Sequence, residues 1–130
     1  MLMKFGSFDV NDYKARADAV SQAEIYRNDY AISVCEAEDC SSPTVVGAQA
    51  ANELLNINGI KASFVLTEYQ GEIYISARSI DELNVQLVME KLGGGGHMNI
   101  AGAQLKDMSV DEEKQLLIDT LDSMHREGEI

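Results

Sequence analysis

Apolar residues recur along this chain with two kinds of spacing. Between residues 43 and 55 they return every three or four positions, as on the buried face of an amphipathic helix. Short apolar runs bounded by turn residues, such as residues 30–35, are instead typical of strands. The same reading along the whole chain gives the order α, β, α, β, β, α, glycine loop, β, α. Strands interleaved with helices predict an α/β fold, with helices covering a sheet.

The predicted elements follow from this pattern and from turn residues between them. Helices are expected at 11–26, 43–57, 79–92 and 109–125, a helical turn at 98–101, and strands at 30–35, 61–69, 72–77 and 103–105. A short turn containing Gly71 joins two of these strands and predicts a hairpin. The sheet flanked by helices is therefore expected to be mixed rather than purely parallel.

Capping signals mark several helix ends. Ser42 precedes a proline at the first helical position, and the runs Ser79–Glu82 and Ser109–Glu112 have the spacing of capping boxes. Gly93 suits the position that follows a helix C-cap.

Residues 1–10 show no period and are interpreted as a linker. The first helix, with Asn11 as a candidate cap, is expected to bury a face of residues at helical spacing: Tyr13, Ala17, Val20 and Ala23.

The run Gly93-Gly94-Gly95-Gly96-His97 is the most unusual stretch. Glycine loses more backbone freedom on folding than any other residue, so four in succession indicate a close approach of the backbone to something. Successive backbone N–H groups that hold a phosphate are one such case; a flexible linker is the alternative. No Lys-Ser or Lys-Thr follows, and the spacing is not G-x-G-x-x-G, so the run is neither a P-loop nor a dinucleotide fingerprint.

Arg78 is the second candidate for phosphate binding. It ends a predicted strand, and Ser79 follows at a predicted helix start, where oriented N–H groups favour an anion. A surface ion pair with Asp81 or Glu82 is the alternative for Arg78, and a solvated loop residue is the alternative for His97. Asn84 is a polar residue on an otherwise apolar helix, and the pattern leaves its direction open.

Composition narrows the function further. The chain has 130 residues, 45% of them hydrophobic, and a formal net charge of −12, which argues against non-specific binding to a nucleic acid backbone. Cys35 and Cys40 are interpreted as reduced thiols, without a disulfide-linked partner. The acidic residues and the two histidines show no metal-binding spacing and no complete catalytic set. These residues therefore predict a phosphate-binding module without its own reaction centre.

The run from Ile75-Ser76-Ala77-Arg78-Ser79 through His97 to Leu105 resembles the DHHA1 domain. That domain follows the DHH domain in phosphoesterases, and the similarity is closest to the C-terminal part of bacterial membrane-bound cyclic-di-AMP phosphodiesterases. The resemblance covers residues 28–125. Residues 1–27 correspond to a linker and an inter-domain helix, and residues 126–130 are expected to form a frayed tail.

The resemblance implies a division of labour. In the family, the DHH domain holds two metal ions, typically manganese, and hydrolyses the substrate, whereas the DHHA1 domain holds the nucleotide. The chain has no Asp-His-His signature, so it is expected to be a cytoplasmic fragment of a membrane-anchored hydrolase, inactive alone and partnered by the DHH domain. The residues carried over as contacts to the nucleotide or cyclic dinucleotide are Arg78, Ser79, Asn84, Gly94, Gly95, Gly96 and His97.

Three alternatives stay open at this point. DHHA1-like domains also end alanyl-tRNA synthetases, which would make the chain a nucleic-acid-binding or assembly module. Other DHH relatives cleave oligoribonucleotides or 3′-phosphoadenosine-phosphate. A homodimer through the helix at 43–55 is the third alternative, against packing of that helix on its own sheet.

Overall fold

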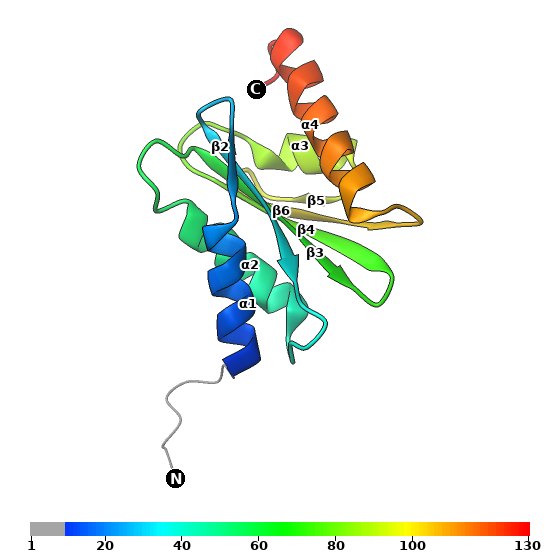
Figure 1. Cartoon of the computed structure of the whole chain (residues 1–130). Coiled ribbons are helices and arrows are strands. Elements are labelled where there is room, and N and C mark those ends of the chain that lie inside the picture. The colour runs from blue at the N-terminus through cyan, green and yellow to red at the C-terminus, as the bar shows by residue number, and fades with distance from the viewer. Residues whose placement is uncertain (1–9) are drawn as a thin grey trace.

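The computed structural model describes residues 10–130, and predictions for residues 1–9 lie outside that part. One mixed sheet has the strand order β1-β2-β3-β4-β6-β5 (Figure 1). The strands are β1 Glu24–Tyr26, β2 Tyr30–Glu36, β3 Ala62–Tyr69, β4 Glu72–Ser79, β5 Gly95–Gly96 and β6 Ile100–Lys106. The helices are α1 Val10–Ser21, α2 Pro43–Leu54, α3 Val85–Lys91 and α4 Val110–Arg126. The predicted α/β class and mixed sheet are confirmed.

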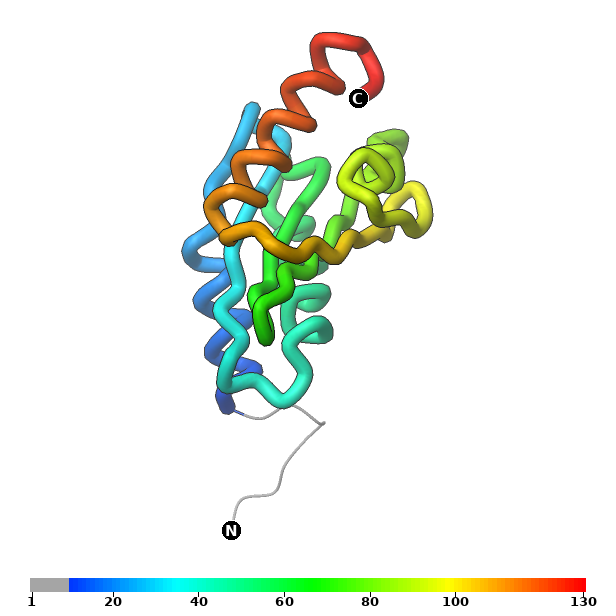
Figure 2. Tube along the Cα trace, turned by 90° about the vertical axis from the view of Figure 1, so that its right-hand side faces the viewer, coloured from blue at the N-terminus to red at the C-terminus, as the bar shows by residue number. Residues whose placement is uncertain are grey.

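The sheet separates two layers of helices. Figure 1 shows α1 and α2 on one side and α3 and α4 on the other, and the quarter-turned view in Figure 2 keeps each pair together. β2 and β3 are parallel because α2 connects them, and every other pair is antiparallel. Alternate residues of a strand face opposite sides. Ala31 and Val65 therefore belong to the core under α1 and α2, and Ile32 and Phe64 to the core under α3 and α4.

Helix α2 covers only part of its face of the sheet. Its small and branched residues pack on β3 and β4, as the spacing predicted: Val46, Gly47, Ala50, Ala51 and Leu54 are buried. On β6, residues on the same face are exposed, and Ile100 has 56% of its surface accessible. Their neighbours on the opposite face, Ala101 and Ala103, are buried. We call the uncovered area formed by β4, β6 and β5 on the α2 side the open face.

The first predicted helix is wrong at both ends. Asn11 lies inside α1, where its side chain donates to the Asp39 carbonyl (3.3 Å), and the helix stops at Ser21. Residues 24–26 form β1 instead, because a tight turn at Arg27 and Asn28, both with positive φ, lets them pair with β2. The predicted face is right for Val20 and Ala23, which pack against the core, but Tyr13 is 51% exposed and Ala19 is buried in its place.

The capping box predicted at Ser79 does not form. β4 continues through Ser79, which pairs with Ala62, and Asp81 at φ 55° turns the chain out of helical geometry. Helix α3 begins after Asn84, whose side chain accepts from the Leu87 N–H (3.3 Å). The helical turn predicted at 98–101 is likewise absent, because β6 already begins at Ile100.

The C-terminal signals give a different outcome. The capping box at Ser109 and Glu112 is confirmed, with both reciprocal hydrogen bonds present. A frayed end was the prediction for residues 126–130; here Glu129 pairs with Lys91 (3.4 Å), and Ile130 packs against the core under α3 and α4. None of the helices within residues 10–130 combines the length and apolar character that a membrane span requires.

Candidate functional site

The open face is built from rows of side chains that run across β4, β6 and β5. Strand register sets the rows, because residues paired across strands point to the same face. Arg78 pairs with Ile100, and Ile100 exchanges two backbone hydrogen bonds with His97 (2.7 and 3.3 Å). The first row is therefore Arg78–Ile100–His97. The next rows along the strands are Ser76–Gly102–Gly95, then Tyr74–Gln104, then Glu72–Lys106.

Arg78 is held in place without being neutralised. Its Nε donates to Asn52 Oδ1 on α2 (2.9 Å), and Nη1 donates to the Ala77 carbonyl (2.9 Å). Within residues 10–130 no carboxylate pairs with it, which excludes the ion pair with Asp81 or Glu82. Partial burial lowers the pKa of the guanidinium, which nevertheless stays charged in proteins. A fixed, unneutralised cation is what an anionic ligand requires.

The glycine run is ordered, which excludes the flexible linker. Gly93 (φ 87°) ends α3 with a Schellman motif: its N–H donates to Glu90, and the Gly94 N–H donates to Met89. A Cβ on Gly94 would lie 2.1 Å from the Gly102 oxygen, and one on Gly96 2.5 Å from Ala101 Cα. Packing therefore requires a glycine at positions 94 and 96, and the positive φ favours one at position 93. Gly95 has neither constraint, because its φ is not positive and a Cβ there would meet nothing within 4 Å.

Ser79 and Asn84 lie away from this face. Ser79 alternates with Arg78 on β4 and is buried on the other side, where its hydroxyl donates to the Leu83 carbonyl (2.7 Å) and accepts from the Asn99 side chain (2.9 Å). Asn84 caps α3, and the next residue donates to the Met98 carbonyl (2.9 Å). Ser79 thus fastens the loop at 97–99, whereas Asn84 caps the helix that follows it in sequence. Strand register brings together Arg78, the glycine run and His97, while Ser79 supports the loop that carries His97.

Several residues of the open face were missed from the sequence. A cavity of about 470 Å³ lies along it, and the missed residues in its lining include Thr44, Tyr74 and Gln104. The period of two along β4 places Tyr74 on the face of Arg78, and that signal was available. The position of Gln104 depended on β6 pairing with β4, which is a contact between distant segments.

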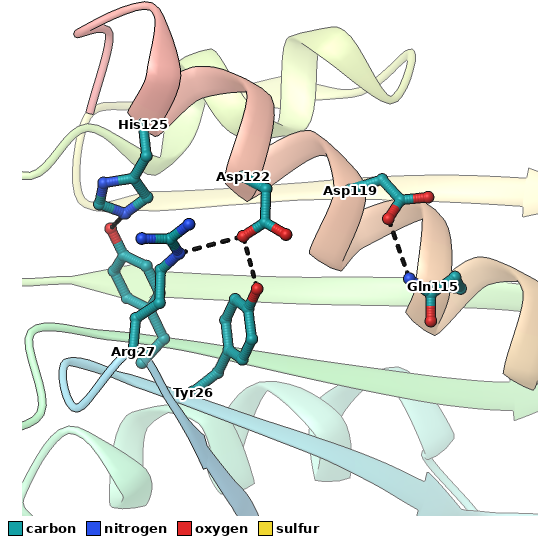
Figure 3. A network of polar contacts seen from close by, with 7 residues as sticks. Tyr26, Arg27, Gln115, Asp119, Asp122 and His125 are labelled. Carbon is teal, nitrogen blue, oxygen red and sulfur yellow. Dashed lines mark hydrogen bonds and ion pairs between the residues drawn. The ribbon is translucent and has the colours of Figure 1, made fainter.

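Another polar network lies on the α4 side of the sheet (Figure 3). Asp122 accepts from the Tyr26 hydroxyl (2.5 Å) and from Arg27 Nε (3.0 Å), which lowers the pKa of this carboxyl. Nearby, His125 Nε2 hydrogen-bonds to the Tyr30 hydroxyl (2.7 Å). These contacts join α4 to β1 and β2, so His125 is engaged in fastening the helix to the sheet.

The other features of the surface fit neither an anion nor a metal ion. A cavity of about 350 Å³ beside α1 is lined by several carboxylates, including Glu36, Glu38 and Glu68, and would repel a phosphate. Within the described part of the chain, no three His, Cys, Asp or Glu side chains are grouped as metal ligands. The residues present therefore do not fit a metal centre, and the open face is the candidate site for an anionic ligand.

Comparison with known proteins gives consistent matches. A model of the DHHA1 domain matches residues 29–127. The chain is 40% identical over 124 residues, 95% of its length, to the cyclic-di-AMP phosphodiesterase PdeA of Listeria monocytogenes, and spans 19% of that protein. It is 36% identical over 130 residues, 98% of its length, to the cyclic-di-AMP phosphodiesterase GdpP of Bacillus subtilis, and spans 20% of it.

A solved structure supports the fold. An exopolyphosphatase-related protein from Bacteroides fragilis superposes with a TM-score of 0.77 at 18% identity, over 91% of this chain and 36% of that one. This likeness concerns the arrangement of helices and strands. The chain spans about a fifth of the length of the curated relatives described above.

Proposed function

The chain belongs to the DHHA1 domain family, and we propose that it is the substrate-holding domain of a phosphodiesterase that hydrolyses cyclic-di-AMP to linear di-AMP. The names of the relatives support this substrate. The observation that carries the proposal is the row Arg78–Ile100–His97 with its unneutralised guanidinium, next to a row that ends at Gly95, a glycine that packing does not require. Such a row offers charge and space to a phosphodiester.

Each residue has a defined task in this proposal. The Arg78 guanidinium, oriented by Asn52, donates to the oxygens of one phosphate. Gly95 leaves room for the ligand to approach the backbone, and Gly94 and Gly96 hold that backbone against β6. The exposed His97 imidazole lies at the end of the row, on the loop that Ser79 fastens.

The reaction itself belongs to another part of the protein in this proposal. The family resemblance implies a DHH domain whose metal ions, manganese in our proposal, would activate the nucleophile and would stabilise charge on the phosphate. This chain contributes binding and orientation of the substrate. The longer protein is proposed to be membrane-anchored, with this domain in the cytoplasm and facing the DHH domain.

Calorimetric titration of the chain with cyclic-di-AMP and linear di-AMP tests the proposal. Replacing Arg78 by alanine should weaken binding about tenfold or more, because a charge-assisted hydrogen bond to phosphate is lost. His97→Ala should have a smaller effect, because His97 is exposed. The matched control is Arg126→Ala, since Arg126 is an exposed arginine at the end of α4.

Two results would contradict parts of the proposal. Equal affinities for the wild type and Arg78→Ala would remove the phosphate site from the open face. Manganese-dependent hydrolysis by the pure chain would overturn the assignment of the reaction to a separate domain.

A further inference from the structure

The far end of the open face carries a polar cluster centred on Glu72. Glu72 Oε2 accepts from the Tyr74 hydroxyl (2.9 Å) and from Gln104 Nε2 (2.6 Å), and Glu72 Oε1 lies 3.2 Å from Lys106 Nζ. Hydrogen bonds from Tyr74 and Lys106 lower the pKa of the Glu72 carboxyl, which keeps it ionised near neutral pH. An ionised carboxylate only accepts hydrogen bonds.

This carboxylate fixes the orientation of the Gln104 amide. Because Glu72 cannot donate, the NH2 group of Gln104 must point toward it, and the amide nitrogen also lies 3.5 Å from the Tyr74 hydroxyl. The Gln104 carbonyl oxygen is therefore directed away from the cluster. No donor within residues 10–130 hydrogen-bonds to this oxygen, and the side chain is exposed. The Gln104 carbonyl oxygen is therefore a hydrogen-bond acceptor that points outward, and the Glu72 carboxylate sets its direction.

Gln104 lies at a useful distance from the phosphate row. It is four residues along β6 from Ile100, or about 13 Å at the usual rise of a strand. The intervening row consists of Ser76, Gly102 and Gly95, which are small, and the cavity of about 470 Å³ extends from Gln104 over Gly102 and Ser76, up to the row next to Arg78. The Tyr74 ring lines the same cavity. A phosphate held by Arg78 thus leaves room for a sugar over the small row and a base near Gln104.

The two purine bases differ in what they present to such an acceptor. Adenine carries an amino group at position 6, which donates, whereas guanine carries an oxygen there, which accepts. With position 6 of the base at the Gln104 carbonyl, guanine would set two acceptors opposite each other, because its donors lie at positions 1 and 2 of the ring. Rotating the amide to suit guanine would turn its carbonyl toward the Glu72 carboxylate and lose a charge-assisted bond.

We propose that Gln104, positioned by Glu72, selects adenine over guanine in the bound dinucleotide by accepting a hydrogen bond from the 6-amino group. This inference rests on the proposed function, because it assumes that a dinucleotide phosphate lies at Arg78. The Tyr74 ring supplies an apolar surface beside the base, which favours any base equally and leaves the choice to Gln104.

Nuclear magnetic resonance titrations of the ¹⁵N-labelled chain with linear di-AMP and linear di-GMP test the inference. The wild type should bind di-AMP about three- to tenfold more tightly, as one hydrogen bond allows, and the Gln104 side-chain amide signals should shift. Gln104→Leu should remove this preference and bring the affinity for di-AMP down to that for di-GMP. Gln115→Leu is the matched control, since its amide lies on α4 and bonds to Asp119 (2.9 Å).

Glu72→Gln tests the positioning role separately. A neutral amide at position 72 both donates and accepts, so Gln104 becomes free to present either of its groups. The variant should gain affinity for di-GMP, a change that general loosening of the face would not produce.

An unchanged ratio of the two affinities in Gln104→Leu would overturn the inference. If Arg78→Ala still weakened the binding of both ligands, the proposed function would stand. Failure of the wild type to bind either dinucleotide would instead overturn the proposed function, and the adenine subsite with it.

Discussion

The two halves of the sheet differ in how they are covered. The half built around β2 and β3 has α1 and α2 on one face and α4 on the other, and Val65 at its centre has no accessible surface. The half built from β6 and β5 is covered on the α3 side alone, and its outer residue Ile100 is 56% exposed. The residues proposed to contact the ligand lie on the open face. Burial and the proposed ligand binding therefore lie in different parts of one sheet.

The largest expected effect concerns a buried carboxyl on the covered side. Glu113 lies on the inner face of α4 with no accessible surface, and neither of its oxygens has a partner in the described structure. Burial raises the pKa of this carboxyl from 4.5 to about 7. The folded state therefore holds a proton that the unfolded state has released. This contribution to stability is complete below about pH 4.5 and is lost as the pH rises through 7.

Urea unfolding of the wild type and Glu113→Gln at pH 5 and pH 8 measures this effect. The wild type should lose up to about 3 kcal/mol of unfolding free energy over this interval, because each pKa unit corresponds to about 1.4 kcal/mol. Glu113→Gln should show little change and be the more stable protein at pH 8. Parallel pH profiles for the two proteins would show that Glu113 is not the titrating group.

Substitution of Gly47 should have the next largest effect on stability, because this glycine lies where α2 packs tightly on the covered half of the sheet. Gly47 lies on the buried face of α2, and a Cβ there would lie 2.3 Å from the Oγ1 of the fully buried Thr67. Gly47→Ala should lower the free energy of unfolding by about 1–3 kcal/mol, the usual range for overpacking a core. The midpoint of urea unfolding at pH 6 measures it. A midpoint equal to that of the wild type would mean that α2 shifts freely on the sheet.

The same local signal had opposite outcomes at two places, which shows what the sequence can predict. Ser109 and Glu112 form a capping box because nothing else competes for their backbone groups. Ser79 has the same spacing to an acidic residue, yet it pairs with Ala62 and donates its N–H to Asn99 (3.0 Å). Ser79 continues the strand because of partners that lie 17 and 20 positions away in the sequence, Ala62 and Asn99. A local sequence pattern carries no information about such distant partners.

The candidate site was predictable to the extent that its residues have local signatures. The cost of four successive glycines identified the run before His97, and a strand-end arginine identified Arg78. Their proximity depends on Ile100 lying between them, which required β6 to pair with β4 rather than with another strand. Gln104 carried no local signal, because its role comes from a carboxylate 32 positions away.

Gly95→Ala should have the smallest effect on stability, and it tests the difference between the two halves of the sheet. Gly95→Ala adds the same methyl group as Gly47→Ala, but on the open face, where a Cβ would meet nothing within 4 Å and φ is not positive. The unfolding free energy should stay unchanged or rise by up to about 1 kcal/mol, because alanine restricts the unfolded chain.

Binding should respond in the opposite way. The added methyl group of Gly95→Ala would project into the small row beside Gly102, where the sugar-phosphate is proposed to lie, and affinity for cyclic-di-AMP should fall about tenfold. Calorimetric titration of Gly95→Ala and Gly47→Ala below their unfolding temperatures separates the two roles. Gly47→Ala should bind as the wild type does wherever it is folded. If Gly95→Ala also bound with wild-type affinity, the absence of a side chain at position 95 would have no connection with the ligand.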